Sequence, residues 1–222
     1  MISRRTKPRV GLLGLVYAVL IACRSPWSVV TLGIGKDVEV EKKLKEILPK
    51  GSVFYGADPV ARGNSVRFSQ IGKFFPLGVN NDTRVETARL LLGNHKVAHV
   101  GIVSFLTNFT LTSDTLEIVF FLQGAEYDLL PLLTKGGALD KHEIVICQVN
   151  VEVHQREEKR RQMFSTIITR ILLDRRYVVL HDSVYKTCNN RKLFFVNFKS
   201  RRCVDRFIVP FFNHYSDSVP EQ

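Results

Sequence analysis

The amino-acid sequence predicts an α/β protein with one mainly parallel sheet that helices cover on both faces. Strand-like and helix-like patterns alternate from Trp27 to about Phe198, and such alternation is typical of parallel sheets with helical crossovers. The chain has 222 residues, of which 45% are hydrophobic, so it is long enough to bury one core of ordinary composition. We expect an N-terminal segment at 1–26, one folded domain at 27–210 and a tail at 211–222.

Strands are expected where short apolar, β-branched runs end at turn residues. The first, Ser28–Ile34, breaks at the triplet Gly33-Ile34-Gly35, and the second, Ser52–Ala57, ends at Asp58-Pro59. Both patterns favour strands that stop at a turn. Further strands are expected at 74–79, 96–103, 117–122, 144–153, 177–180 and 192–198.

Helices are expected between these strands, where apolar residues recur at helical spacing. The first covers 38–48 and is stopped by Pro49-Lys50-Gly51. A second covers 125–135 and is closed by Gly136 and Gly137. The clearest is 157–174, whose single apolar stripe consists of Met163, Phe164, Ile167, Ile168, Ile171 and Leu172.

The net charge of +11 is concentrated near the two ends of the chain. Residues 155–206 carry 14 basic and five acidic residues. Such an excess can meet nucleic acid, a membrane surface or an acidic substrate. No RNA- or DNA-binding motif accompanies it, so a solvated basic face is favoured and nucleic acid is not expected as a partner.

The N-terminus has the layout of a secretory signal. Four basic residues within 4–9 precede the uncharged run 10–23, which is shorter than the ~20 residues of a comfortable membrane span. A cleaved signal or a membrane anchor through 10–23 is favoured over a buried N-terminal helix. We therefore expect a secretory or membrane-anchored protein, with a cytoplasmic one as the alternative. Asn81 and Asn108 begin Asn-x-Thr triplets, which accept glycans in that pathway.

The four cysteines show no metal-ligand spacing. Cys147 lies within an apolar strand pattern and is expected to be a small core residue. Cys188 and Cys203 flank the last strand and are candidates for a disulfide in an oxidising compartment. No metal site is predicted.

The glycine turn after the first strand is a candidate nucleotide pocket. In open α/β sheets, ligands bind outside the carboxyl ends of the strands. Gly33 and Gly35 stand at such an end, but Val38 occupies the place of the third glycine of a pyrophosphate-binding turn. Asp58 follows at about the ~20-residue separation from which an acid reaches ribose hydroxyls. The pattern favours S-adenosylmethionine; the alternative is a structural turn followed by Asp37 as a helix-capping acid.

Seven segments together resemble a known family. They are "VVTLGIGKDVEVEKKLKEILP", "FYGADPV", "IGKFFPLGV", "QGAEYDLLPLLTKGGALD", "ICQVNVEVH", "LLDRRYV" and "CVDRF". In this order, from about Val29 to Phe207, they resemble the FkbM-type methyltransferase domain, most closely its animal branch. The resemblance implies a seven-stranded Rossmann-like methyltransferase sheet and methyl transfer from S-adenosylmethionine, usually to oxygen. It also implies that Gly33, Gly35 and Asp37 line the cofactor's methionine side and that Asp58 holds the ribose.

The chain departs from this family at the end of the strand expected at 117–122, which corresponds to the family's fourth strand. The family's pattern there is Asp-x-Glu-Gly-x-Glu, and this chain has Phe121 and Gln123 in place of the first two acids, whereas Glu126 remains. A carboxylate beside a sulfonium cofactor can stabilise charge or act as a general base; phenylalanine can do neither. The departure supports an alternative in which the fold is kept as a catalytically inactive binding module.

A second polar row lies in "CQVNVEVH". Gln148, Asn150, Glu152 and His154 alternate with valines, so the strand period places the polar groups on one face. Glu152 and His154, with Glu126, are candidate catalytic residues, and Gln148 and Asn150 are candidate substrate-binding residues. One solvated strand face is the alternative.

The favoured function is O-methyl transfer from S-adenosylmethionine to a small-molecule or glycan acceptor. The inactive binding module is second, and RNA binding through 156–206 is third.

Overall fold

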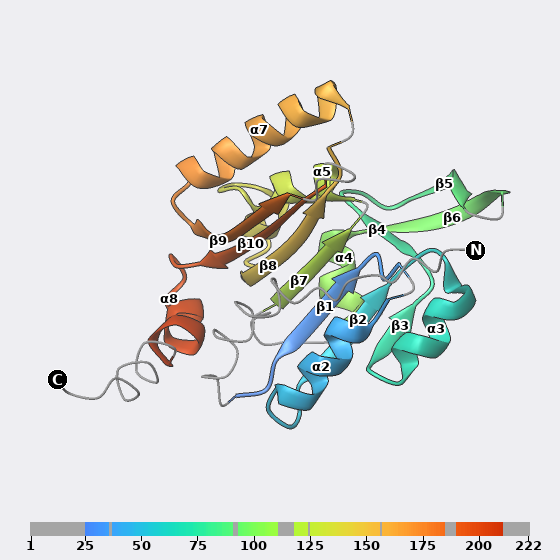
Figure 1. The fold of residues 1–222 in the computed structure, drawn as a ribbon, viewed down its shortest axis with the longest axis horizontal. Coiled ribbons are helices and arrows are strands. Elements are labelled where there is room, and N and C mark those ends of the chain that lie inside the picture. Colours follow the sequence, from blue (N-terminus) through green and yellow to red (C-terminus); the bar gives the residue numbers. More distant parts are fainter. Residues whose placement is uncertain are drawn as a thin grey trace.

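The chain folds around a seven-stranded sheet with the order β3-β2-β1-β7-β8-β10-β9 (Figure 1). The computed structural model describes residues 25–35, 37–90, 93–110, 118–123, 125–155, 157–184 and 190–210. The first five strands in this order, from β3 to β8, run parallel, and β10 is antiparallel to both β8 and β9. The predicted α/β fold is confirmed. The strands are β1 (Ser28–Leu32), β2 (Val53–Ala57), β3 (Lys73–Phe75), β7 (Ile118–Gln123), β8 (Ile146–Val153), β9 (Tyr177–Val184) and β10 (Arg191–Asn197).

A smaller sheet with the order β4-β6-β5 projects from one end of the molecule (Figure 1). Its strands are β4 (Gly78–Asn80), β5 (Arg84–Leu90) and β6 (Gly93–Gly101). The single strand expected at 74–79 is wrong, because β3 and β4 are separate strands in different sheets. Pro76 lies between them, where a residue without an N–H interrupts a ladder. The hairpin strand β5 is not among the predicted elements.

The helices agree with the predicted ones where the apolar period is long. They are α2 (Glu39–Ile47), α3 (Ala61–Ser69), α4 (Ile102–Ser104), α5 (Glu126–Leu129), α6 (Ala138–Lys141), α7 (Glu158–Leu173) and α8 (Arg201–Cys203), with η1 (Phe105–Phe109), η2 (Leu130–Leu133) and η3 (Val204–Ile208). The expected helix at 125–135 is instead α5 followed by the 3₁₀ turn η2. Pro131 within that segment lacks the N–H that an α-helix interior needs.

Two hydrophobic clusters cover the two faces of the large sheet. One contains Val30, Val149 and Phe195 and is closed by α4, η1, α5, η2, α6 and α7. The other contains Val29, Cys147 and Phe194 and is closed by α2, α3, α8 and η3. We call the second side of the sheet the α2 face. The central strands are therefore buried on both sides, as parallel strands usually are.

The apolar stripe of α7 is narrower than expected. Phe164 and Ile171 are buried, whereas Met163 is 42% exposed and Leu172 45% exposed. The helix covers η2, α5 and the edge strand β9, so the flanks of the stripe extend past the sheet into solvent.

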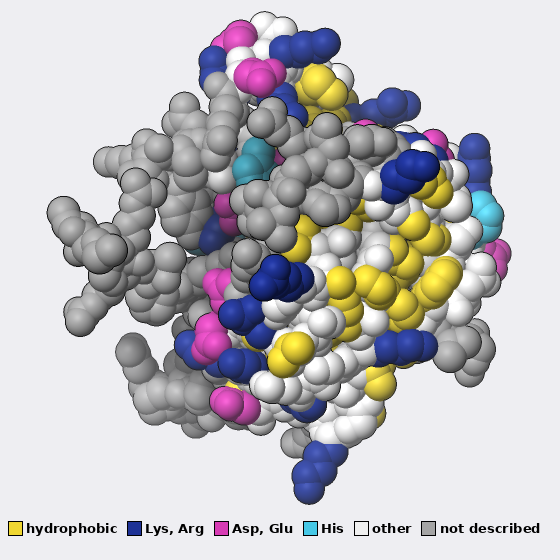
Figure 2. Space-filling model, turned by 90° about the vertical axis from the view of Figure 1, so that its right-hand side faces the viewer, with side chains coloured by type: hydrophobic (Ala, Val, Ile, Leu, Met, Phe, Trp, Pro, Cys, Tyr) yellow, Lys and Arg dark blue, Asp and Glu magenta, His cyan; other side chains and the backbone are white. Residues whose placement is uncertain are grey.

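Seen from the side on which α3, β5 and β6 lie, hydrophobic side chains gather on part of the surface, and Lys and Arg side chains are scattered around them (Figure 2).

A disulfide joins β8 to α8. Cys147 and Cys203 are bonded, with 5.2 Å between their Cα atoms and 56 residues between them in sequence, and both are fully buried. The candidate pairing of Cys188 with Cys203 is therefore wrong, because Cys203 is bonded to Cys147. Cys147 is buried in the core as expected. The positions of cysteines along a sequence do not determine which of them pair. Cys188 itself lies outside the described residues.

The predicted signal or anchor also lies almost entirely outside the described residues, which begin at Ser25. Among the residues that the structure describes, no helix is both long and apolar enough to span a membrane. The membrane tether through 10–23 therefore stays a prediction.

Candidate functional site

The loop after β1 is built around the carboxylate of Asp58. Gly33 and Gly35 have positive φ angles of 81° and 63°, a conformation that glycine adopts without a Cβ clash. This turn points the N–H groups of Ile34 and Gly35 at Asp58 Oδ2, over 2.9 and 3.2 Å. The N–H of Val60 donates to Asp58 Oδ1 over 2.7 Å. Asp58 thus ties the ends of β1 and β2 together.

The Asp58 carboxylate retains capacity for a ligand. A carboxylate can accept about four hydrogen bonds, and within the part of the chain that the structure describes Asp58 accepts three from the backbone. The residue is 7% exposed, so a hydroxyl group at the strand ends can supply the fourth. The residues present therefore fit the ribose hydroxyls of an adenosine-type cofactor, and the same carboxylate sets the shape of the loop that would hold it.

Asp37 lies at the start of α2, on the surface of the loop. Its Oδ1 accepts the N–H of Glu39 over 3.2 Å, and the residue is exposed. This bond satisfies an unpaired amide in the first turn of the helix. The geometry thus contains the helix-capping role that the sequence offered as the alternative; contact with the cofactor's methionine side stays a prediction.

A buried carboxylate that the sequence reasoning missed lies behind the same loop. Glu41 is 3% exposed, and its Oε1 accepts a hydrogen bond from Thr31 Oγ1 over 2.9 Å. The signal was available, because Glu41 is three residues from both Val38 and Leu44 and so shares their inward face of α2. A charged residue inside an apolar stripe is uncommon unless it is paired.

Glu126 and His154 form the best-defined polar pair at the carboxyl edge of the sheet. Glu126 Oε1 lies 2.8 Å from His154 Nδ1 and accepts the N–H of His154 over 2.9 Å. The hydroxyl of Tyr127 donates to the carbonyl of His154 over 2.9 Å. The short segment after β7 thus holds the residue after β8 by its ring, its amide and its carbonyl.

This pairing determines where the imidazole carries its proton. Burial by itself raises the pKa of Glu126, but the hydrogen bonds from the His154 ring and amide outweigh it and lower that pKa below its ordinary value. Glu126 is therefore ionised at neutral pH and can only accept hydrogen bonds. Nδ1 of His154 must be the donor, which leaves Nε2 as the ring nitrogen that takes up a proton.

Tyr127 is tuned by the same pair. Burial, followed by the neighbouring Glu126 charge, raises the pKa of Tyr127, and Arg160 opposes this. The Arg160 guanidinium lies 5.5 Å from the centre of the Tyr127 ring. The phenol therefore stays protonated and keeps its hydrogen bond to the His154 carbonyl.

Glu152 lies apart from this pair and belongs to a second polar cluster. Asn190 Nδ2 donates to Glu152 Oε1 over 2.9 Å, and Lys192 Nζ lies 3.7 Å from Glu152 Oε2. Lys192 is 6% exposed. The structure thus separates the predicted catalytic trio into Glu126–His154 and Glu152–Lys192. Sequence reasoning does not single out Lys192, which is the first residue of the strand expected at 192–198.

Gln148 and Asn150 lie on the α2 face of β8, below Glu152. Gln148 is 0% exposed and Asn150 2% exposed. Strand register aligns Asn150 with Phe121 and, through it, with Thr31. Gln148 is aligned with Val119 and Val29, nearer the amino ends of the strands. Their predicted contact with substrate is thus at different depths: Asn150 near the edge and Gln148 deeper.

Register also places the two departures from the family pattern. Phe121 lies between Thr31 on β1 and Asn150 on β8, and Gln123 lies beside Glu152. β7 separates β1 from β8, so the strand that precedes the glycine loop and the strand that precedes His154 lie about 10 Å apart.

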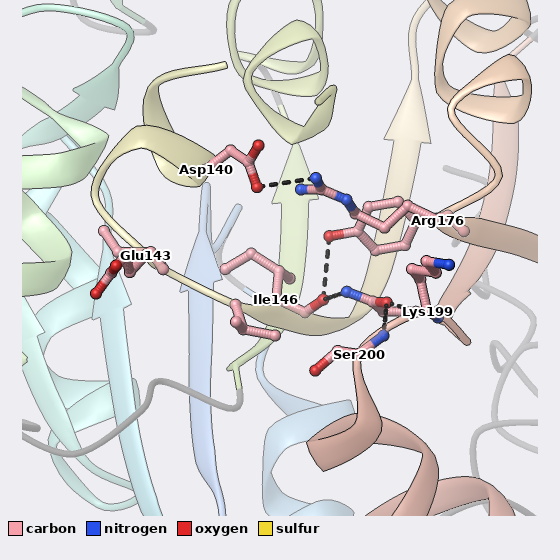
Figure 3. Close-up of a pocket in the computed structure, with 10 residues that line it drawn as sticks. Asp140, Glu143, Ile146, Arg176, Lys199 and Ser200 are labelled. Atoms are coloured by element: carbon pink, nitrogen blue, oxygen red, sulfur yellow. Dashed lines mark hydrogen bonds and ion pairs between the residues drawn. The ribbon is translucent and has the colours of Figure 1, made fainter. Parts of the chain in front are cut away.

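A cavity lies at the end of β8 opposite to His154 (Figure 3). This cavity of about 220 Å³ is lined by residues that include Asp140, Ile146 and Arg176. Arg176 pairs with Asp140 over 2.8 Å, and the carbonyl of Ile146 accepts hydrogen bonds from Tyr177 and Asn197. Since Ile146 is the first residue of β8, the cavity lies at the amino end of the strand, away from the predicted cofactor position. Within the described residues, no cluster of three metal-ligating side chains is found.

Comparison with known proteins identifies the fold. No protein-family model and no curated protein matches the chain, so membership of the FkbM family and its animal branch stays a prediction. Solved structures do match. An O-methyltransferase from Bacillus cereus in complex with SAH aligns at a TM-score of 0.51 and 10% identity, over 88% of this chain and 84% of that one.

Two further structures are similar. The O-methyltransferase TomG from Streptomyces achromogenes, in complex with SAM, aligns at a TM-score of 0.50 and 10% identity, over 86% of this chain and 81% of that one. A protein from Clostridium thermocellum described as an rRNA methylase aligns at 0.52 and 8% identity, over 88% and 98%. At such identities the likeness concerns architecture. The chain has the Rossmann-like α/β fold of methyltransferases.

Proposed function

We propose that the chain is an S-adenosylmethionine-dependent O-methyltransferase whose general base is His154. The observation that carries the proposal is the Glu126–His154 pair at the carboxyl edge of the sheet, on the edge where open α/β sheets bind ligands. The neighbouring loop of Gly33, Gly35 and Asp58 fits an adenosine-type cofactor. The similar O-methyltransferases solved with SAH or SAM support this choice of cofactor.

The protein's own residues divide the task between them. Asp58 holds the glycine loop and accepts a ribose hydroxyl. Glu126 keeps the proton of His154 on Nδ1, so Nε2 accepts the proton of an acceptor hydroxyl as its oxygen becomes a nucleophile. Bound S-adenosylmethionine supplies the electrophilic methyl group. Enzymes commonly orient a catalytic base by a hydrogen bond from another group, and here Glu126 orients His154 in this way.

The lost acids at Phe121 and Gln123 are compatible with this assignment. A base on the segment after β8, oriented from the segment after β7, does not require a carboxylate at the end of β7. The departure nevertheless favours a second candidate, an inactive binding module of the same fold. It would keep the structure and lack turnover.

Calorimetric titration of S-adenosylhomocysteine into the purified full-length chain tests the first step. We expect micromolar binding that is lost in Asp58→Ala and retained in His154→Gln, because only Asp58 shapes the cofactor loop. Absence of binding by wild-type protein with a cooperative melting transition would contradict the proposal and favour the module. Once an acceptor is found, His154→Gln should lower the methylation rate about 100-fold or more, while the affinity for the cofactor stays unchanged.

We place the protein in the secretory pathway or at a membrane as a further part of the proposal. The Cys147–Cys203 disulfide supports this, because such bonds persist in oxidising compartments. The basic and apolar N-terminus and the Asn-x-Thr triplets point in the same direction.

A further inference from the structure

Two buried amide side chains of β8 have no structural partner. None of the polar side-chain atoms of Gln148 and Asn150 has a hydrogen-bond partner among the residues that the structure describes. Both side chains are at least 98% buried. The amide oxygen of Asn190 also has no hydrogen-bond partner among the described residues, although its amide nitrogen donates to Glu152. Native proteins leave few buried polar groups unpaired, and each exception calls for a cause.

These amides form one row on the α2 face. Gln148, Asn150 and Glu152 alternate along β8 and span about 13 Å at strand rise. Lys192 on β10 is directly opposite Glu152, and Asn190 bonds to the same carboxylate. The row therefore runs from the middle of the sheet to its carboxyl edge, where Glu152 is two residues before His154.

The row is electrically balanced. Glu152 and Lys192 compensate each other at 3.7 Å, and the remaining members are neutral amides. A charged ligand would therefore find no free opposite charge in the row, because Glu152 and Lys192 already neutralise each other. Burying an unpaired charge is costly, so the row favours a neutral ligand.

The donor and acceptor pattern narrows the ligand further. The unpartnered atoms comprise two amide nitrogens, which donate, and three amide oxygens, which accept. A carboxylate or phosphate only accepts and would leave the oxygens unpaired; an ammonium only donates and would leave the nitrogens unpaired. A hydroxyl group does both. Resting on the proposed function, we infer that Gln148, Asn150 and Asn190 bind a neutral, polyhydroxylated acceptor, a sugar or sugar-like polyol, and present one of its hydroxyls to His154.

A stability measurement tests whether these amides serve a ligand. Asn150→Leu keeps the number of side-chain heavy atoms and removes the unpartnered polar groups. We expect its melting temperature without ligand to rise by about 2–4 °C, the shift that roughly 1 kcal/mol produces in a domain of this size. Gln148→Leu should also raise it and serves as a second variant if Asn150→Leu fails to fold.

Asn197→Leu is the matched control. Asn197 is equally buried, 3% exposed, but its Nδ2 donates to the carbonyl of Ile146 and its Oδ1 accepts the N–H groups of Lys199 and Ser200. Its substitution should lower the melting temperature. A fall in both β8 variants comparable to that of the control would overturn the inference, because it would mean that water or protein satisfies those amides.

Ligand binding is tested separately from cofactor binding. Saturation-transfer NMR on the full-length chain would use a panel of neutral di- and trisaccharides, the corresponding sugar phosphates, aminosugars and uncharged peptides. We expect binding of neutral saccharides that weakens at least tenfold in Asn150→Leu and also in Gln148→Leu. Preference for phosphates, aminosugars or peptides, or binding of no probe, would refute the inference. Binding of S-adenosylhomocysteine measures the proposed function independently, so the two can fail separately.

Discussion

His154 illustrates how single side chains in this protein are defined by their partners. Its ring, amide and carbonyl are all held by the segment Glu126-Tyr127. A histidine on a mobile side chain would sample several rotamers and two tautomers. Here the ionised Glu126 selects one tautomer, and the two backbone contacts fix the position of the ring. Which ring nitrogen of this proposed base can take up a proton thus depends on a residue 28 positions away in sequence.

Replacing Glu126 with glutamine should make stability less dependent on pH. The pKa of Glu126 in the folded protein lies below its ordinary value of 4.5. The ionised group therefore stabilises the fold above that value, and this contribution is lost as the pH falls through the lowered pKa. At neutral pH we expect Glu126→Gln to lower the free energy of unfolding by about 1–3 kcal/mol.

Denaturant unfolding of wild type and Glu126→Gln at a series of pH values measures this effect. The difference between the two proteins should be constant near neutral pH and should shrink below pH 4.5. A difference that grows as the solution is acidified would show that Glu126 has a raised pKa and that the assigned histidine tautomer is wrong.

Among the secondary-structure elements, α8 is held on the sheet by the disulfide. α8 has only three residues and cannot hold itself on the sheet by helix propensity. Cys203 ties it to β8, and Phe207 of η3 packs edge-on against Trp27 with 4.5 Å between ring centroids. The end of the described chain thereby covers the start of β1.

Removing the disulfide should destabilise the fold without changing its topology. For a loop of 56 residues, chain-entropy arguments give about 4 kcal/mol, or roughly 10 °C in melting temperature for this size of domain. We expect Cys147→Ala and Cys203→Ala, singly or together, to produce similar losses, measured by thermal melting with and without reductant. Cys188→Ala is the control and should leave the linked Cys147–Cys203 peptide intact in a non-reducing digest. A Cys188–Cys203 peptide in wild-type protein would contradict the pairing.

For the whole molecule, the exposure of the Asn-x-Thr triplets bears on the proposed location in the secretory pathway. Asn81 is exposed in the turn between β4 and β5, and Thr83 of the same triplet is also exposed. Asn108 is exposed in η1. Glycan attachment at either asparagine is therefore compatible with the folded surface, and the buried disulfide requires an oxidising environment to form.

Expression of the full-length chain in mammalian cells tests this assignment. We expect a decrease in apparent mass on treatment with a glycosidase that removes N-linked glycans, a smaller decrease in Asn81→Gln, and none in the variant that combines Asn81→Gln with Asn108→Gln. A wild-type protein that is insensitive to the enzyme and recovered with reduced cysteines would place it outside the secretory pathway.

The sequence by itself determined the α/β class, the main strands of the large sheet and the helices α2 and α7. It did not predict α3, which is as long as α2. Hydrophobic period is a local property, so β1, β8 and α7 can be recognised from their own residues. The same period missed the separation of β3 from β4 and the break at Pro131, because short elements carry too few residues to define a period. It also placed Glu126 and His154 among the candidate residues, each from its own motif.

Only the tertiary structure decided which of these residues are in contact. The pairing of Glu126 with His154, of Glu152 with Lys192 and of Cys147 with Cys203 joins residues that are 28, 40 and 56 positions apart. Strand order and register, which bring those positions together, are set by packing of the whole sheet rather than by any local pattern. The same packing buries the amides of Gln148 and Asn150 without partners, and burial is what turns an ordinary alternating strand into a candidate binding site.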